Sequence, residues 1–269
     1  MLRTRLLTAL VALPVIIFFI WKGGIIFAAF IIAIILGALF EFYTLFKIKF
    51  KINLFRTLGI IGIIFGVVLG LIGRCGSDVI YNACLTITIL LGLSLQLIDK
   101  DPTEALASGA MAIFGLIYTA WLFSHFIILR QLPLGMNYVF SVVAITWFGN
   151  TAAYFIGSKW GKKKLLPRIS PHKSVEGAIA ELVTAVAVSI LCRWGFNNDL
   201  SVKHSVILGL MVGLFSLMGD LTESMIKRAA QVKDTGTIIP GHGGILDRID
   251  SLLFTAPAYY YYLKVFVLR

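Results

Sequence analysis

Charged residues are scarce in this chain. Only 14% of its 269 residues are Asp, Glu, Lys or Arg, whereas 59% are hydrophobic and the mean hydropathy is +0.93. A soluble domain carries about 25% charged residues, so the composition excludes an ordinary soluble protein. A chain this apolar must expose hydrophobic surface to an apolar phase, and the lipid bilayer is the expected one. No hydrophilic stretch is long enough for a separate soluble domain.

Cysteines are few, and the chain has no internal repeat. The three cysteines, Cys75, Cys84 and Cys192, do not have the spacing of metal ligands, and their odd number leaves one unpaired. They therefore predict neither a disulfide framework nor a metal site. The chain has no internal repeat, which counts against a transporter built from repeated halves with broken helices at the membrane midplane.

Apolar runs of about 20 residues, the length of a membrane-spanning helix, fill most of the chain. We predict an all-α, polytopic membrane protein that forms a single membrane domain, with N-terminal helices in 1–130 and catalytic helices and loops in 137–269. The nine expected spans are 4–21, 24–46, 54–73, 79–98, 105–129, 137–157, 177–195, 204–226 and 251–268. Arg3 and Arg5 precede the first run as in a secretory signal. No small-residue cleavage site follows it, so we keep it as a span.

Basic residues are divided unevenly between the two sides that nine spans define. With the N-terminus in the cytoplasm, the cytoplasmic side receives 17 of the 24 Lys and Arg and the other side receives 7. This bias follows the positive-inside rule. We therefore predict a multi-pass protein of the cell (inner or plasma) membrane, with its N-terminus and the polar loops 158–176 and 227–250 in the cytoplasm. The net charge of +11 then faces anionic lipids, and we expect no nucleic-acid partner.

Acidic residues are few, and five of the 13 lie between 220 and 250. Asp220 stands at the end of an apolar run, where a carboxylate is costly without a partner. Asp247 and Asp250 are three residues apart and would face the same way on a helix. Carboxylates interleaved with Lys and Arg are typical of sites that bind Mg²⁺ and phosphate. The alternatives are a solvated loop of mixed charge here and an ordinary positive-inside loop at 158–176.

The stretch SMIKRAAQVKDTGTIIPGHGGILDRID, residues 224–250, resembles the signature of the phosphatidate cytidylyltransferases, also called CDP-diacylglycerol synthases. Every fixed position of that signature is met, by Ser224, Lys227, Arg228, Lys233, Asp234, Gly236, Ile239, Pro240, His242, Gly243, Gly244, Asp247, Arg248 and Asp250. The segments AAY, GKKKL and ISPHKSVEG are also close to family elements, with Ser174 in place of a Thr. The resemblance covers 147–250 well. The first hundred residues resemble the family only in general features, such as the early arginines and Glu41 in the second span.

The resemblance implies an enzyme that transfers a cytidylyl group from CTP to phosphatidate, giving CDP-diacylglycerol and pyrophosphate in phospholipid biosynthesis. CTP, phosphatidate and the bilayer are the implied partners, and a homodimer is left open. The implied cofactor is Mg²⁺, with a second cation left open, and the metal ligands would be Asp220, Asp247 and Asp250. The catalytic residues would be Lys227, Arg228, Lys233, Asp234, His242 and Arg248, and the substrate-binding residues Asn150, Tyr154, Ser170, Lys173, Ser224, Gly243 and Gly244.

One position departs from the family. An Asp usually precedes the Ala-Tyr pair, whereas Asn150 stands there in WFGNTAAY. Asn keeps an acceptor oxygen and gains two donors, but it lacks the negative charge. We expect Asn150 either to line the nucleotide site through hydrogen bonds or to bridge helices.

Two related enzyme classes and a transporter are the alternatives. CDP-alcohol phosphotransferases share the carboxylates and the metal, but they carry an Asp-Gly-x-x-Ala-Arg start that is absent here. CTP-dependent polyprenol kinases resemble the family more distantly and are not expected to meet the full signature. The signature therefore favours the cytidylyltransferase.

Overall fold

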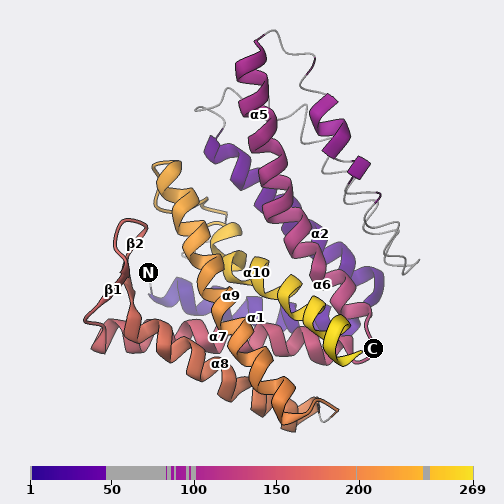
Figure 1. The fold of residues 1–269 in the computed structure, drawn as a ribbon, viewed down its shortest axis with the longest axis vertical. Helices are drawn as coiled ribbons and strands as arrows, with labels where there is room; N and C mark the ends of the chain where they lie inside the picture. Colours follow the sequence, from indigo (N-terminus) through magenta and orange to yellow (C-terminus); the bar gives the residue numbers. More distant parts are fainter. Residues whose placement is uncertain are drawn as a thin grey trace. The chain divides into compact units, whose positions relative to one another are not determined.

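The computed structural model describes residues 2–46, 83, 86–87, 89–94, 97, 101–197, 199–238 and 243–268, and most of them are helical (Figure 1). The helices are α1 (Leu2–Lys22), α2 (Gly24–Phe46), α5 (Pro102–Gly115), α6 (Leu122–Gln131), α7 (Gly135–Trp160), α8 (Val175–Phe196), α9 (Val202–Ala229) and α10 (Leu246–Tyr262). The π-helical segment η1 (Leu116–Trp121) joins α5 to α6, and η2 (Leu263–Val267) extends α10.

Five helical segments of the described residues are long and apolar enough to cross a membrane: α2, the continuous helix Pro102–Gln131, α7, α8 and α9. They coincide with five of the predicted spans, so the mostly helical architecture is confirmed, and the length and composition of these five helices suit a membrane protein. The predicted spans 4–21 and 251–268 correspond in position to α1 and α10, which are not among the five. The span 54–73 and most of 79–98 lie outside the described residues. The count of nine spans stays a prediction.

A short hairpin corrects the all-α prediction. Within the loop 158–176, strands β1 (Lys164–Leu166) and β2 (Ser170–Ser174) pair antiparallel, with Lys164 opposite Ser174 and Leu166 opposite Ser170. The amide of Ile169 donates to the carbonyl of Leu166 at 3.1 Å and closes the turn. Two prolines and a run of basic residues conceal the alternation by which a strand is recognised in sequence.

Capping side chains fix the start of three helices. Asp101 accepts a hydrogen bond from the amide of Thr103 at 2.8 Å before α5, and Pro102 occupies the first turn. Ser174 and Ser201 cap α8 and α9 in the same way. Each cap satisfies an amide that the first helical turn leaves without a carbonyl partner. Because Ser174 both ends β2 and caps α8, the hairpin is held directly against the beginning of that helix.

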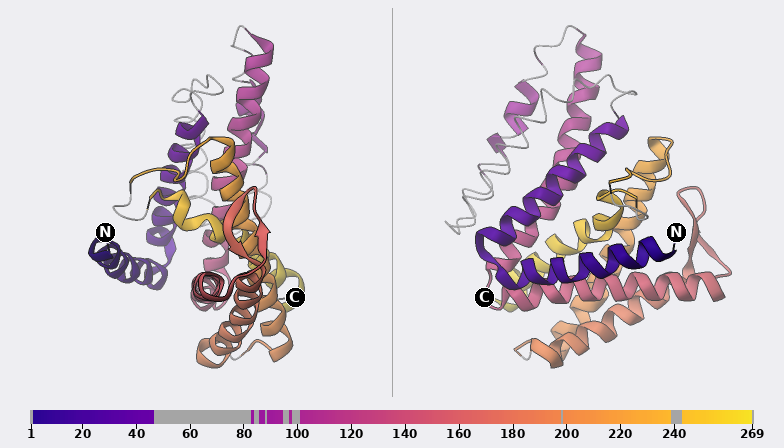
Figure 2. Two further views of the ribbon diagram at one scale, coloured as in Figure 1. Left: turned by 90° about the vertical axis from the view of Figure 1, so that its left-hand side faces the viewer. Right: turned by 180° about the vertical axis from the view of Figure 1, so that it is seen from behind.

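The chain forms two compact units. The first contains the described residues of 1–127 together with 234–247, and the second contains those of 128–233 and 248–269. In the first unit, α2 packs against α1, α5 and η1. In the second, α8 packs against both α7 and α9, and β2 contacts all three of these helices (Figure 2). The polar segment 234–247 therefore belongs with the N-terminal helices, although the sequence places it among the catalytic loops.

Candidate active site

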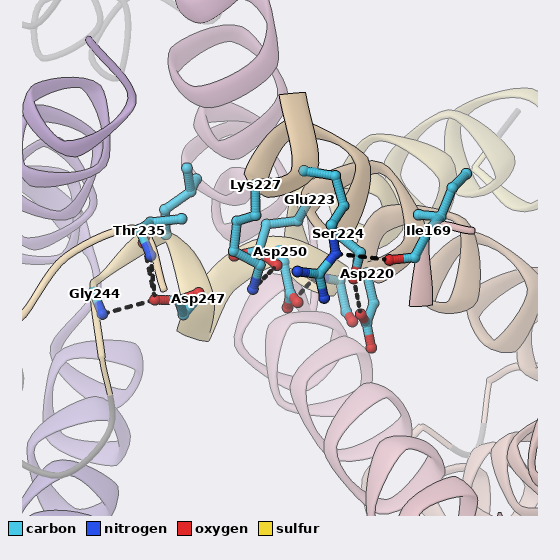
Figure 3. A network of polar contacts seen from close by, with 12 residues as sticks. Ile169, Asp220, Glu223, Ser224, Lys227, Thr235, Gly244, Asp247 and Asp250 are labelled. Carbon is cyan, nitrogen blue, oxygen red and sulfur yellow. Dashed lines mark hydrogen bonds and ion pairs between the residues drawn. The ribbon is translucent and has the colours of Figure 1, made fainter. Parts of the chain in front are cut away.

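A group of charged and polar side chains gathers at the C-terminal end of α9 in the second unit (Figure 3). We call it the α9 cluster, and its members are Lys173, Asp220, Glu223, Ser224, Lys227 and Asp250. Asp220, Ser224 and Lys227 are spaced four and three residues apart, so they share one face of the helix. Lys173 comes from β2 and Asp250 from the beginning of α10.

Ion pairs hold the α9 cluster together. The Nζ of Lys173 lies 2.8 Å from Oδ2 of Asp220, and the Nζ of Lys227 lies 2.5 Å from Oε2 of Glu223. The hydroxyl of Ser224 donates to Oδ1 of Asp220 at 3.5 Å. The pair between Lys173 and Asp220 joins the hairpin to α9. Within the second unit, the structure thus brings a lysine of the polar loop 158–176 to the aspartate near the end of an apolar helix.

Asp250 lies near enough to Asp220 for the two carboxylates to interact electrostatically, because α9 and α10 approach closely at Gly219. A Cβ atom at Gly219 would lie 2.6 Å from the carbonyl oxygen of Asp250 and 3.0 Å from Cα of Ser251. Burial, and after it the negative charge of Asp220, raises the pKa of Asp250, while Lys227 and Lys173 act in the opposite direction. Two neighbouring carboxylates that are partly shielded from water favour the binding of a cation, since the cation stabilises the ionised form of each.

The donor set of the α9 cluster fits Mg²⁺. Asp220 and Asp250 offer carboxylate oxygens and Ser224 offers a hydroxyl, which are hard oxygen ligands. In phosphate-transfer sites Mg²⁺ is usually held by one or two carboxylates together with substrate phosphates and waters. Within the described ranges, no group of three or more His, Cys, Asp or Glu residues is arranged to hold a metal ion. The protein would therefore supply part of the coordination sphere and the substrate the rest.

Asp247 organises the loop around it in the first unit. Its Oδ2 accepts hydrogen bonds from the amide of Thr235 at 3.0 Å, the hydroxyl of Thr235 at 3.0 Å and the amide of Gly244 at 2.8 Å (Figure 3). Gly243 has a φ of 85°, a backbone conformation that favours glycine. A Cβ atom there would also lie 2.7 Å from Oδ2 of Asp247. The predicted metal ligand Asp247 thus holds Thr235 and Gly244 in place, and its role toward a metal stays a prediction.

Glu41 is a buried polar residue that is not among the predicted site residues. It lies in α2, is only 2% exposed, and accepts hydrogen bonds from the hydroxyl of Thr235 at 3.2 Å and the amides of Ile245 and Leu246 at 2.9 Å each. The sequence did hold a signal for it. A carboxylate inside an otherwise apolar span is expensive and marks a functional residue by default.

Asn150 bridges three helices of the second unit. Its Nδ2 donates to Oγ of Ser251 on α10 at 3.0 Å, and its Oδ1 accepts from Oγ of Ser216 on α9 at 2.9 Å. Ser251 directly follows Asp250 and donates its amide to Oδ1 of that carboxylate at 2.6 Å. These hydrogen bonds bridge helices, which is the second of the two roles expected for Asn150. Through Ser251 they also help to hold the carboxylate of Asp250 in place.

Removing this bridge should weaken the fold. In Asn150→Ala, the buried hydroxyls of Ser216 and Ser251 lose their shared partner, and a buried group left unsatisfied costs about 1–3 kcal/mol. We expect a lower thermal unfolding temperature for the purified protein in detergent. Thr151→Ala is the matched control on the next residue, because Thr151 is exposed and its hydroxyl bonds only within α7, to the carbonyl of Trp147 at 2.7 Å. Equal unfolding temperatures for the two variants would contradict the bridge.

The other predicted cationic residues lie at the surface. Arg228 is exposed, and its Nε donates to the carbonyl of Ile169 at 3.3 Å, which ties the hairpin to the end of α9. Lys233 and Arg248 are exposed, as is Asp234. The exposed side chains of Lys233 and Arg248 can turn toward a phosphate that arrives from water.

Three further predicted residues have other placements. Tyr154 is 71% exposed on α7, where its ring packs edge-on against Phe155, so it points away from the buried face of its helix. Ser170 is half-buried at the start of β2. His242 lies outside the described residues. Of these, only Ser170 lies on the element that delivers Lys173 to the α9 cluster.

Known proteins are similar in sequence to this chain over most of its length. Residues 3–266 match the profile of the cytidylyltransferase family. The phosphatidate cytidylyltransferase of Bacillus subtilis (strain 168) is 33% identical over 270 residues, covering 98% of both chains. The enzyme of that name from Staphylococcus aureus (strain COL) is 33% identical over 258 residues, covering 95% of this chain and 96% of its own. The one from Thermotoga maritima is 37% identical over 187 residues, covering 67% and 69%. With a family match of this extent and identities at this level, the chain belongs to the cytidylyltransferase family.

Proposed function

We propose that this membrane protein is a phosphatidate cytidylyltransferase, which makes CDP-diacylglycerol for phospholipid biosynthesis. The observation that carries the proposal is the α9 cluster, where the carboxylates of Asp220 and Asp250 interact with Lys173 and Lys227 near the end of an apolar helix. Ser224, Lys227 and Asp250 belong to the family signature. The similar proteins named above, which match this chain over most of its length, bear the name of this activity.

The reaction needs charge stabilisation more than it needs a protein nucleophile. A phosphate oxygen of phosphatidate attacks the α-phosphorus of CTP and forms a P–O bond. The bond between the α-phosphorus and the oxygen that bridges it to the β-phosphorus breaks, and pyrophosphate leaves with that electron pair. Phosphatidate is itself the nucleophile, so the protein contributes in-line positioning and compensation of negative charge. Bound Mg²⁺ would neutralise charge on the phosphate oxygens.

We assign Asp220 and Asp250 as the residues of the α9 cluster that would hold Mg²⁺. Lys173 and Lys227 now pair with carboxylates, and they turn to phosphate oxygens when substrate is present. An ammonium group on a flexible stem makes such an exchange readily, because it is a point charge without a fixed hydrogen-bond plane. Arg228 and Arg248, both exposed, are assigned to the pyrophosphate part of CTP, whose paired oxygens suit the planar guanidinium group.

The position of the α9 cluster suits a reaction between a lipid and a nucleotide. It occupies the last turns of α9, one of the five helices long and apolar enough to span a membrane. Phosphatidate approaches from the bilayer and CTP from the aqueous side. We place this end of α9 and the N-terminus in the cytoplasm, in the cell membrane, because 17 of the 24 basic residues then lie on that side.

Cysteine labelling tests this orientation. Lys162 precedes α8 and Lys203 follows it, and both are exposed. In a background without Cys75, Cys84 and Cys192, we expect a membrane-impermeant maleimide to label Lys203→Cys from outside intact cells. Lys162→Cys should be labelled only after the cells are opened. Labelling of both positions from the same face would exclude α8 as a span and overturn the orientation.

The product tests the reaction. With CTP labelled at the α-phosphate and phosphatidate in mixed micelles, the purified protein should give a labelled CMP-bearing lipid and unlabelled pyrophosphate. A polyprenol kinase would instead give CDP and a phosphorylated alcohol, and a CDP-alcohol phosphotransferase would leave CTP unused. Asp220→Asn, purified in parallel, controls for a contaminating enzyme. If the parent formed no labelled lipid under these conditions, the proposal would be rejected.

A further inference from the structure

One face of α2 holds the loop that carries the signature glycines. Gly37 and Glu41 are four residues apart on this face. A Cβ atom at Gly37 would collide with the side chain of Ile245, so α2 and the loop are in direct contact there. Glu41 provides the polar part of the same contact through its three hydrogen bonds to Thr235, Ile245 and Leu246.

The loop is shaped to admit this carboxylate. A Cβ atom at Gly236 would lie 2.6 Å from Oε1 of Glu41, and one at Gly244 would collide with Oε2 of Glu41 and with the hydroxyl of Thr235. Two signature glycines therefore leave the space in which the Glu41 carboxylate lies. Their small size is explained by a residue of the N-terminal helices, some 200 positions away in the chain.

Glu41 and Asp247 act on the loop from two sides. The hydroxyl of Thr235 lies 3.2 Å from Oε2 of Glu41 and 3.0 Å from Oδ2 of Asp247, so the two carboxylates share it. Glu41 also receives the amides of Ile245 and Leu246, where α10 begins. A carboxylate at the first amides of a helix satisfies donors that lack carbonyl partners and interacts favourably with the helix dipole.

We propose that Glu41 is a positioning residue for cytidylyl transfer: from α2, it fixes Thr235 and the start of α10 at Ile245 and Leu246, and through them the orientation of Asp247. The inference rests on the proposed function for its effect on catalysis. Its structural part, the ordering of the loop by Glu41, stands independently. Glu41 acts through these residues and has no assigned contact with substrate.

Protease accessibility tests the structural part without reference to activity. Lys233 and Arg248 flank the loop and are exposed, so trypsin cleavage there reports how often the segment opens. Glu41→Gln keeps the size of the side chain but replaces one acceptor oxygen by an NH₂ group, which cannot accept the hydrogen bond of a backbone amide. Loss of the charge-assisted bonds should lower the free energy of opening by about 1.4 kcal/mol, which raises the open population about tenfold. We therefore expect cleavage at both positions to be about tenfold faster in this variant. Cleavage at Lys162 should keep the parent rate and serves as the internal reference.

Kinetics with matched variants tests the catalytic part. We expect Glu41→Gln to lower kcat about 10- to 100-fold, the scale of a small misplacement of reacting groups, with a much smaller change in KM for CTP. Thr235→Val, which removes the shared hydroxyl, should lower kcat in the same direction, and Thr235→Ser, which keeps it, should restore the parent value. Glu104→Gln, an exposed acid at the first turn of α5, should leave kcat and cleavage unchanged.

The protease and kinetic experiments together show which part of the proposal fails. Parent-like cleavage at Lys233 and Arg248 in Glu41→Gln would overturn the ordering of the loop, whatever the protein catalyses. Faster cleavage with an unchanged kcat would overturn the positioning role and leave Glu41 as a structural residue. A parent protein without cytidylyl transfer would overturn the proposed function, and the protease comparison would still decide whether Glu41 orders the loop.

Discussion

Asp220→Asn should lower cytidylyl transfer by about 10²–10³-fold, the loss typical of removing one preorganised electrostatic contact, while the protein stays folded. Asn removes the charge but almost no volume. Asp220 pairs with Lys173 at 2.8 Å and is one of the two carboxylates that we assign to Mg²⁺. Its replacement therefore weakens metal binding and also releases Lys173 from the position in which it faces the site.

Initial rates over a Mg²⁺ titration measure this effect. For the parent, chelation by EDTA should abolish transfer and added Mg²⁺ should restore it. For Asp220→Asn, half-maximal activity should require more Mg²⁺ and the maximal rate should stay low. Asp199→Asn is the matched control, because Asp199 is an exposed aspartate in the connection that precedes α9. Parent-like activity of Asp220→Asn at limiting Mg²⁺ would refute the assignment of this carboxylate.

Gly219→Ala should produce the second large loss, although it changes neither charge nor polarity. The added Cβ atom would lie 2.6 Å from the carbonyl oxygen of Asp250, which is backbone and cannot turn aside. The beginning of α10 must then move away from α9, and Asp250 with it. A displacement near 1 Å at a catalytic group costs about 10²-fold in rate, and the overpacked contact costs about 1–3 kcal/mol of stability.

The chain offers a glycine for comparison. Gly195 lies in the last turn of α8, and a Cβ atom there would meet nothing within 4 Å. Gly195→Ala should therefore unfold at the parent temperature or slightly above it, since Ala is favoured over Gly in a helix by about 0.5–1 kcal/mol. Both variants are assayed for transfer rate and thermal unfolding in the same detergent. If Gly219→Ala matched Gly195→Ala in both, close approach of α9 and α10 would play no part in the site.

The membrane class and the family could be predicted from sequence because both depend on local features. A run such as 24–46 needs only its own residues to be long and apolar enough for a span, and α2 covers the same residues. The signature from Ser224 to Asp250 is likewise a matter of residue order. The hairpin of β1 and β2 was missed for a local reason too, since the prolines and lysines of 162–174 do not show the alternation of a strand.

Only the tertiary structure decided which polar residues meet. The ion pair of Lys173 with Asp220 joins the hairpin to α9, two elements whose contact the order of residues does not reveal. Asn150, left between two roles by its chemistry, proved to bond with Ser216 and Ser251.

Glu41 shows the physical reason why sequence alone does not determine which polar residues meet. The sequence places it in an apolar span and so determines that its carboxylate needs partners, because an unpaired charge there is costly. Which donors it finds depends on how α2 packs against a loop 204 residues further along the chain. Apolar length and motif order are properties of one segment, whereas hydrogen bonds over such separations exist only after burial has brought the segments together.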